Sequence, residues 1–163
     1  MGAMREHVLR EFFLGRLDAT ALSRDLEGAI VLQGFDEAAV RVVDLEEGDD
    51  VVTTEQLVRV CDAVERGLLE AWKLEAIGVC LVFSDHFWWD ATTPDGSRVA
   101  RVLSDWAAPM ASYPLTPRTV AKARHLLLTG EVTFTEDDLL DVPERAWPVR
   151  HVGKRIEKDP VPR

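Results

Sequence analysis

The chain has 163 residues, of which 47% are apolar and 29% charged, a composition typical of one soluble globular domain. It carries 29 acidic and 19 basic residues, and the net charge of −10 excludes general binding to nucleic acids or anionic membranes, which requires positive potential. The longest apolar run, Ala76–Phe83, is too short to span a bilayer, for which about 20 residues are needed.

The first two elements are predicted to be helices. Asp18 is placed to cap a short helix that Gly28 would end. Before it, between residues 5 and 15, apolar residues recur at the i, i+3, i+4 spacing of an amphipathic helix, namely Val8, Leu9, Phe12 and Phe13.

The next segment has two interpretations. Ala29–Leu32 and Val40–Leu45 are short β-branched runs that fit two small strands. Glu37-Ala38-Ala39, however, equally fits the extension of a helix. The sequence leaves this choice open.

Two helices follow in the middle of the chain. Thr53 and Gln56 form a capping-box pattern that predicts a helix from Thr54 to Arg66, ended by Gly67. Leu68–Phe83 is predicted as a further helix that becomes apolar on nearly every side. A helix of that kind belongs in the centre of a bundle.

The remaining elements are also helical. Thr92–Gly96 is predicted as a turn, and Ser97–Trp106 has the apolar periodicity of a helix. Thr116 and Pro117 begin another helix that stops at Gly130, and Glu136–Asp141 forms a last short one.

These elements predict a mainly α fold, a single-domain helical bundle over residues 4–143 with at most a small β element near residues 29–45. Residues 144–163 form a C-terminal tail that contains three prolines, and within it Arg145–Arg163 has 6 basic and 2 acidic residues. We do not expect this basic tail to bind nucleic acid, because the body of the protein is strongly acidic.

The compartment is predicted from two features. The N-terminus is charged and lacks the apolar stretch of a secretory signal. Cys61 and Cys80 each lie in an apolar run, where a free cysteine behaves as a small buried hydrophobe. We therefore expect a cytoplasmic protein whose two cysteines are reduced.

One segment concentrates reactive and aromatic side chains, Asp85-His86-Phe87-Trp88-Trp89-Asp90. The spacing of Asp85, His86 and Asp90 matches no standard metal motif, and we expect no metal and no cofactor. Catalytic motifs such as a nucleophile elbow or a phosphate-binding glycine loop are absent. The tryptophans fit either core packing or an aromatic surface for a partner.

The acidic excess lies in the first half of the chain. Residues 17–75 contain 15 acidic and 5 basic residues, a net charge of −10, and the densest run is Asp44–Asp50. The run fails the EF-hand pattern, because its glycine and its distal glutamate are misplaced. It therefore fits either a solvated acidic loop or a docking patch for a basic partner.

Three segments resemble small acidic bacterial immunity-type proteins of toxin systems: Phe87-Trp88-Trp89-Asp90, Asp105-Trp106-Ala107-Ala108-Pro109 and Tyr113-Pro114-Leu115-Thr116. The resemblance covers residues 54–130 and is one of class, since such proteins share a role rather than a motif. It implies a cytoplasmic, non-enzymatic inhibitor that blocks the active site of a toxin. No functional residue is carried over from it.

We therefore expect a non-enzymatic protein-binding module that neutralises a basic protein partner such as a bacterial toxin. Its predicted contact residues combine acidic side chains, which steer the encounter, with aromatic ones, which carry interface energy. They are Asp36, Glu37, Asp44, Glu46, Glu47, Asp49, Asp50, Trp88 and Trp89. Two alternatives stay open. One is a regulatory or structural protein that self-associates through its apolar helix, and the other is a small enzyme with a site around Asp85, His86 and Asp90.

Overall fold

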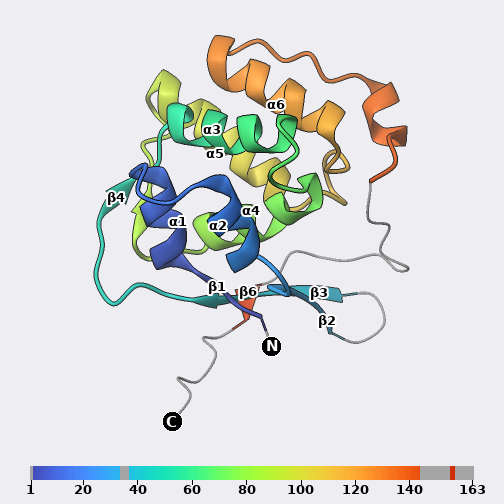
Figure 1. Cartoon of the computed structure of the whole chain (residues 1–163). Helices are drawn as coiled ribbons and strands as arrows, with labels where there is room; N and C mark the ends of the chain where they lie inside the picture. Colours follow the sequence, from blue (N-terminus) through green and yellow to red (C-terminus); the bar gives the residue numbers. More distant parts are fainter. Residues whose placement is uncertain (1, 34–36, 144–154, 157–163) are drawn as a thin grey trace.

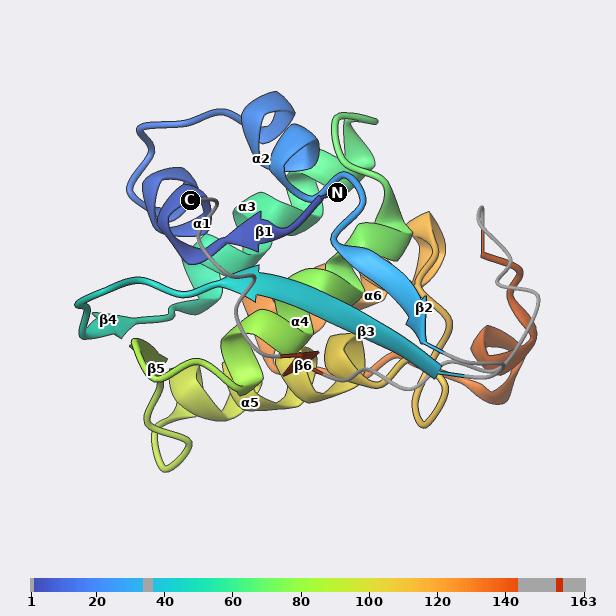
Figure 2. The same cartoon turned by 90° about the horizontal axis from the view of Figure 1, so that it is seen from below.

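Helix α4 (Leu74–Val82) lies at the centre of the computed structural model, which describes residues 2–33, 37–143 and 155–156. All residues from Leu74 to Leu81 are buried, as expected for a helix that is apolar on every side. Strand β3 (Glu37–Val43) crosses α4, and α5 (Pro94–Ala107) packs along it (Figure 2). The prediction of a central apolar helix is thus confirmed.

The other helices surround this core (Figure 1). Helix α1 packs against α2, and α3 packs against α5 and α6. Their bounds are α1 (Glu6–Phe13), α2 (Ala19–Asp25), α3 (Thr54–Glu65) and α6 (Pro117–Thr129), with the 3-10 helices η1 (Ala71–Lys73) and η2 (Glu136–Leu140).

The predicted caps are confirmed. Asp18 accepts a hydrogen bond from the Ala21 N–H at 2.8 Å, and Thr53 and Gln56 form the reciprocal capping box. These side chains satisfy N–H groups that have no partner inside a helix. Gly130 ends α6 with a φ of 78°, a conformation that glycine adopts without steric cost.

The predicted helices differ from the observed ones mainly in three places. The last one, Glu136–Asp141, is the 3-10 helix η2. The expected helix Leu68–Phe83 is split, because the chain is extended at Glu70 before η1 and α4 begin. Helix α5 starts three residues earlier than Ser97, since Thr93 accepts a hydrogen bond from Gly96 and Pro94 occupies the first turn. The same Thr-Pro pair that fits a turn therefore begins a helix.

The segment with two interpretations forms strands. Strand β2 (Ile30–Gln33) pairs antiparallel with β3, which confirms the small β element and excludes the helical alternative. Strand β3 also pairs in parallel with β1 (Met4–Arg5) and with β6 (Arg155–Ile156), a segment of the basic tail. A separate two-stranded ribbon joins β4 (Asp50–Val51) to β5 (Phe87–Trp88).

Four of the described charged residues are buried, namely Glu6, Lys73, Glu75 and Asp138, and the partners of Lys73 and Glu6 show how the interior holds them. The Lys73 ammonium is 2% exposed and donates hydrogen bonds to Glu27, at 2.8 Å, and to the backbone and hydroxyl oxygens of Ser23. Glu6 is fully buried and accepts a hydrogen bond from the Leu45 N–H at 3.0 Å. Buried charges persist only when they are paired in this way.

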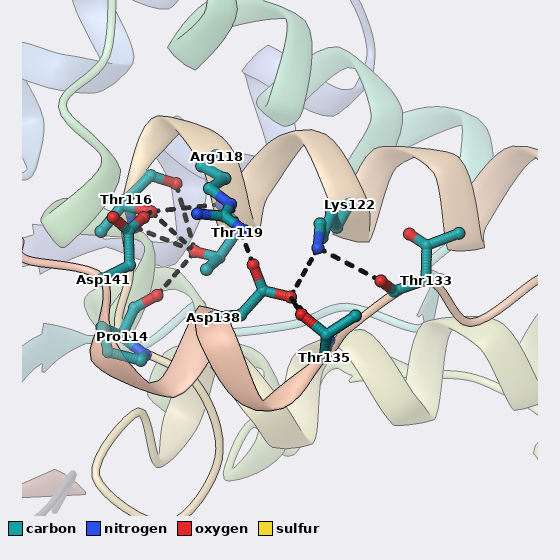
Figure 3. Close-up of polar contacts among 9 residues, drawn as sticks. All are labelled: Pro114, Thr116, Arg118, Thr119, Lys122, Thr133, Thr135, Asp138 and Asp141. Atoms are coloured by element: carbon teal, nitrogen blue, oxygen red, sulfur yellow. Dashed lines mark hydrogen bonds and ion pairs between the residues drawn. The ribbon is translucent and has the colours of Figure 1, made fainter.

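Asp138 holds the segment that follows α6 against that helix (Figure 3). Its carboxylate is buried, pairs with Lys122 at 2.6 Å and with Arg118 at 3.1 Å, and accepts a hydrogen bond from the Thr135 N–H. The hydrogen bond from Lys122, followed by that from Thr135, lowers the pKa of the Asp138 carboxyl.

The close packing of α4 against α5 depends on the absence of a side chain at Gly78. A Cβ at this position would lie 2.6 Å from the Ala107 backbone nitrogen. Although alanine normally favours a helix over glycine, we expect Gly78→Ala to lower the free energy of unfolding by about 1–3 kcal/mol through overpacking. Urea denaturation measures this change, with Ser104→Ala on the exposed side of α5 as the control that does not lower stability, because alanine also favours a helix over serine. A more stable Gly78→Ala protein would contradict the packing.

The Asp138 network predicts a dependence of stability on pH. Because the folded pKa lies below that of the unfolded chain, ionised Asp138 stabilises the fold above the ordinary carboxyl pKa of about 4, and this contribution is lost at lower pH. We expect the free energy of unfolding of Asp138→Asn to fall less steeply than that of the wild type on acidification. The exposed neighbour provides the control, and Asp137→Asn should follow the wild-type profile. Parallel profiles for all three proteins would contradict the assignment.

Candidate partner-binding surface

The β4–β5 ribbon brings together the two segments that the sequence singles out separately. The Asp50 N–H donates to the His86 carbonyl at 2.8 Å, and the Val52 N–H donates to the Trp88 carbonyl at 2.9 Å. The acidic run Asp44–Asp50 therefore ends directly beside the aromatic segment. Both figures place β4 at the margin of the molecule (Figures 1 and 2).

The two faces of the ribbon have opposite surroundings. Phe87 is buried and meets the Phe13 ring edge-on at a centroid distance of 6.1 Å. Val51 and Trp88 are register partners and are 47% and 46% exposed. Because successive side chains of a strand alternate between faces, one face of the ribbon packs on α1 and the other presents an apolar pair to solvent.

Helix α1 holds the acidic loop in place. The Arg10 Nε lies 2.6 Å from the Asp50 carboxylate, and the Arg10 Nη2 donates to the Glu47 carbonyl at 3.0 Å. At the start of the loop, buried Glu6 accepts from the Leu45 N–H. Charge-assisted hydrogen bonds of this kind are among the stronger ones in proteins, so the loop has a defined position.

Gly48 permits the close approach of these groups. A Cβ on Gly48 would lie 2.2 Å from the Arg10 Nη2 and 3.2 Å from the His86 Cβ. The His86 Nδ1 lies 3.3 Å from the Gly48 carbonyl oxygen. Since a carbonyl oxygen only accepts, this contact requires the proton on Nδ1. His86 thus acts here as a contact that orients the loop.

Some of the predicted acidic contact residues are exposed to solvent, and others already form contacts within the protein. Glu46, Glu47 and Asp49 are exposed, and their carboxylates form no ion pair within the described part of the chain. Asp50 is committed to Arg10, and Asp44 is half-buried and already interacts within the chain.

The tryptophans divide in the same way. Trp88 is exposed, whereas Trp89 is half-buried and packs against the hydrophobic core. Trp89 follows β5 directly and is therefore less accessible to a partner than Trp88, and its place in the contact surface stays a prediction. Asp36 lies outside the described residues, and of Glu37 the structure describes the backbone at the start of β3.

The structure adds three residues to the predicted contact set, of which Val51 was not predicted, whereas Asp85 and Asp90 were predicted for the alternative enzyme site. Val51 supplies half of the apolar pair, and Asp85 lies exposed next to His86. On the other side of Trp88, the exposed Asp90 carboxylate accepts hydrogen bonds from the Thr92 hydroxyl and N–H, which lower its pKa. Five exposed carboxylates thus belong to the two segments that meet at the apolar pair, and we call them the carboxylate rim: Glu46, Glu47, Asp49, Asp85 and Asp90.

Of the three side chains considered for a catalytic site, Asp85, His86 and Asp90, two are engaged in local contacts. His86 contacts the Gly48 carbonyl and Asp90 folds back on Thr92. Three hollows that described residues line, of which the largest has about 480 Å³, contain none of the three side chains. Within the described residues, no cluster of three or more His, Cys, Asp or Glu could hold a metal ion.

The two cysteines are unsuited to nucleophilic catalysis. Both are buried, and desolvation raises the pKa of each thiol well above its ordinary value. A nucleophilic cysteine requires the opposite, a thiol that ionises readily. Both side chains belong to the hydrophobic core, as predicted.

Comparisons with protein-family models, with curated proteins and with solved structures find no match for this chain. Among the described residues, no helix combines the length and the apolar character needed to cross a membrane. The geometry of the β4–β5 ribbon and its carboxylate rim is therefore the basis for a functional proposal.

The contact between α1 and the loop can be tested directly. We expect Arg10→Ala to accelerate hydrogen exchange of the Asp50 amide by about fivefold, because a half-exposed ion pair contributes about 1 kcal/mol. Exchange measured by NMR reports this change. Arg16→Ala removes another arginine ion pair, the one with Glu11, and should leave the Asp50 amide unaffected. Equal exchange in both variants would contradict the role of Arg10.

Proposed function

We propose that this protein is a non-enzymatic binding module that holds a basic protein partner at the β4–β5 ribbon. The observation that supports this proposal is the exposed pair of Val51 and Trp88, which lies where two segments with five exposed carboxylates meet. An exposed apolar group rimmed by polar residues is typical of an interaction site. The sign of the rim makes a basic surface the complementary one.

Each part of the surface has a distinct physical role in this proposal. The carboxylates attract a basic partner over about a Debye length and accelerate the encounter. Trp88 and Val51 then lose their contact with water, and buried aromatic residues carry much of the energy of a typical interface. Arg10 and Glu6 keep the loop ordered before binding, which lowers the entropic cost of association.

The partner that we propose is a basic bacterial toxin, which the protein would neutralise in the cytoplasm. A protein with a net charge of −10 is suited to cover a positively charged active site. Self-association through the apolar helix is less well supported, because Leu74–Leu81 of α4 is already buried within the monomer.

Charge reversal at the loop tests the proposal. In affinity capture from the native host, we expect the wild type to retain one stoichiometric basic protein at low salt and less of it at high salt. The variant Glu46→Lys/Glu47→Lys/Asp49→Lys should retain at least about tenfold less of this basic protein than the wild type, because like charges then face each other. Quantitative mass spectrometry of the bound fraction measures the loss.

A matched control variant distinguishes an effect of the loop carboxylates from an effect of the overall net charge. Glu131→Lys/Glu136→Lys/Asp137→Lys reverses three exposed carboxylates, of which the first follows α6 and the other two lie in η2. In Figure 1, η2 is on the side of the molecule opposite β4. Both variants carry a net charge of −4, since each changes the −10 of the wild type by +6. Retention of the basic protein should therefore persist in this control. An equal loss in both variants, or no loss in either, would contradict the proposed surface.

A further inference from the structure

Strand β4 has an open edge. Asp50 and Val52 direct their N–H groups toward β5, and alternate residues of a strand direct their backbone groups to opposite sides. The N–H and C=O of Val51 therefore point away from β5. Among the described residues neither group has a hydrogen-bond partner, and Val51 is 47% exposed.

An open edge of this kind can accept another strand. Unpaired N–H and C=O groups at a sheet edge form a template for an added segment, and several families of binding domains use it for peptides. The edge lies beside the apolar pair of Val51 and Trp88, which supplies contacts for side chains on one face of an added strand. Backbone pairing and side-chain contacts thus coincide at one place.

The charges around the edge determine which strand fits. Glu47 and Asp49 precede Val51 along the same chain, and both are exposed. A second copy of this chain paired at β4 would bring its own carboxylates against them, and like charges placed opposite each other disfavour a strand pair. A segment with lysine or arginine flanking an apolar residue would meet opposite charges instead.

We propose that β4 takes up an extended, basic segment of the partner as a third strand of the ribbon, in the order β5–β4–partner. This inference rests on the proposed function and specifies its mode. The partner segment exchanges hydrogen bonds with the Val51 N–H and C=O. Its apolar residues cover Val51 and Trp88, and its basic residues face the carboxylate rim.

The test uses a capped heptapeptide of alternating lysine and valine as the probe and the full-length protein as the receptor. We expect saturable binding by isothermal titration calorimetry, and slower hydrogen exchange of the Val51 amide by at least about tenfold when the peptide is bound. Binding should weaken at high salt.

Two variants at one position isolate the backbone contact. Val51→Pro removes the outward N–H without removing a hydrogen bond of the ribbon, and proline is tolerated at such an edge. Val51→Ala trims the side chain and keeps the N–H. We expect Val51→Pro to bind the peptide at least about tenfold more weakly than Val51→Ala. The Asp50 amide signal and the circular dichroism spectrum confirm that both variants are folded.

Three results would overturn the inference: no binding of the peptide by the wild type, equal affinity of the two variants, or an unchanged exchange rate of the Val51 amide in the complex. The host capture experiment distinguishes this failure from failure of the proposed function. If capture still depends on Glu46, Glu47 and Asp49, the module binds its partner through side chains alone. If capture is independent of them, the proposed function itself is wrong.

Discussion

The burial of α4 is the constraint on which the rest of the structure depends. A helix whose residues Leu74–Leu81 are all inaccessible to solvent must be covered on every side, because exposing its apolar surface costs about 25 cal/mol per Å². Strand β3 and helix α5 cover it directly, and α3 and α6 form the next layer. Gly78 allows the backbone of α5 to approach closely. After α4 the chain reaches the surface, where Phe83 is 55% exposed.

The candidate surface is organised by one face of α1. Glu6 binds the start of the acidic loop, Arg10 binds its middle and end, and Phe13 packs against Phe87 of β5. These residues follow one another at spacings of four and three, which place side chains on the same side of a helix. A short amphipathic helix thus fixes both strands of the β4–β5 ribbon. The exposed acids and Trp88 owe their position to this support.

The helices were predictable from the sequence because their signals are local. Caps such as Thr53 with Gln56, and stops such as Gly130, act within one turn of the residues that they satisfy. The β4–β5 ribbon was not predictable, since each of its strands has two residues and its pairing joins segments more than 30 residues apart. The periodicity of so short a strand carries no information.

The same distinction holds for the candidate site. The acidic run and the aromatic segment were visible in the sequence. The sequence alone, however, does not distinguish Trp88 from Trp89 as contact residues. Only the packing of Trp89 against the core separates it from exposed Trp88, and only the contact with Arg10 separates Asp50 from Asp49. Val51 had no distinguishing feature until its register with Trp88 was known. Exposure and pairing are properties of the fold, so these assignments required the structure.

The central claim is that the exposed face of the β4–β5 ribbon meets a basic partner. Photo-crosslinking in the native host tests it most directly, with p-benzoylphenylalanine in place of Trp88 in one protein and in place of Leu140 in another. Leu140 is the more exposed of the two, at 80% against 46%, and lies on η2 away from the ribbon (Figure 1). The account predicts a crosslink to one basic protein from position 88 and none to that protein from position 140. A crosslink from position 140 alone, or none from position 88, would contradict it.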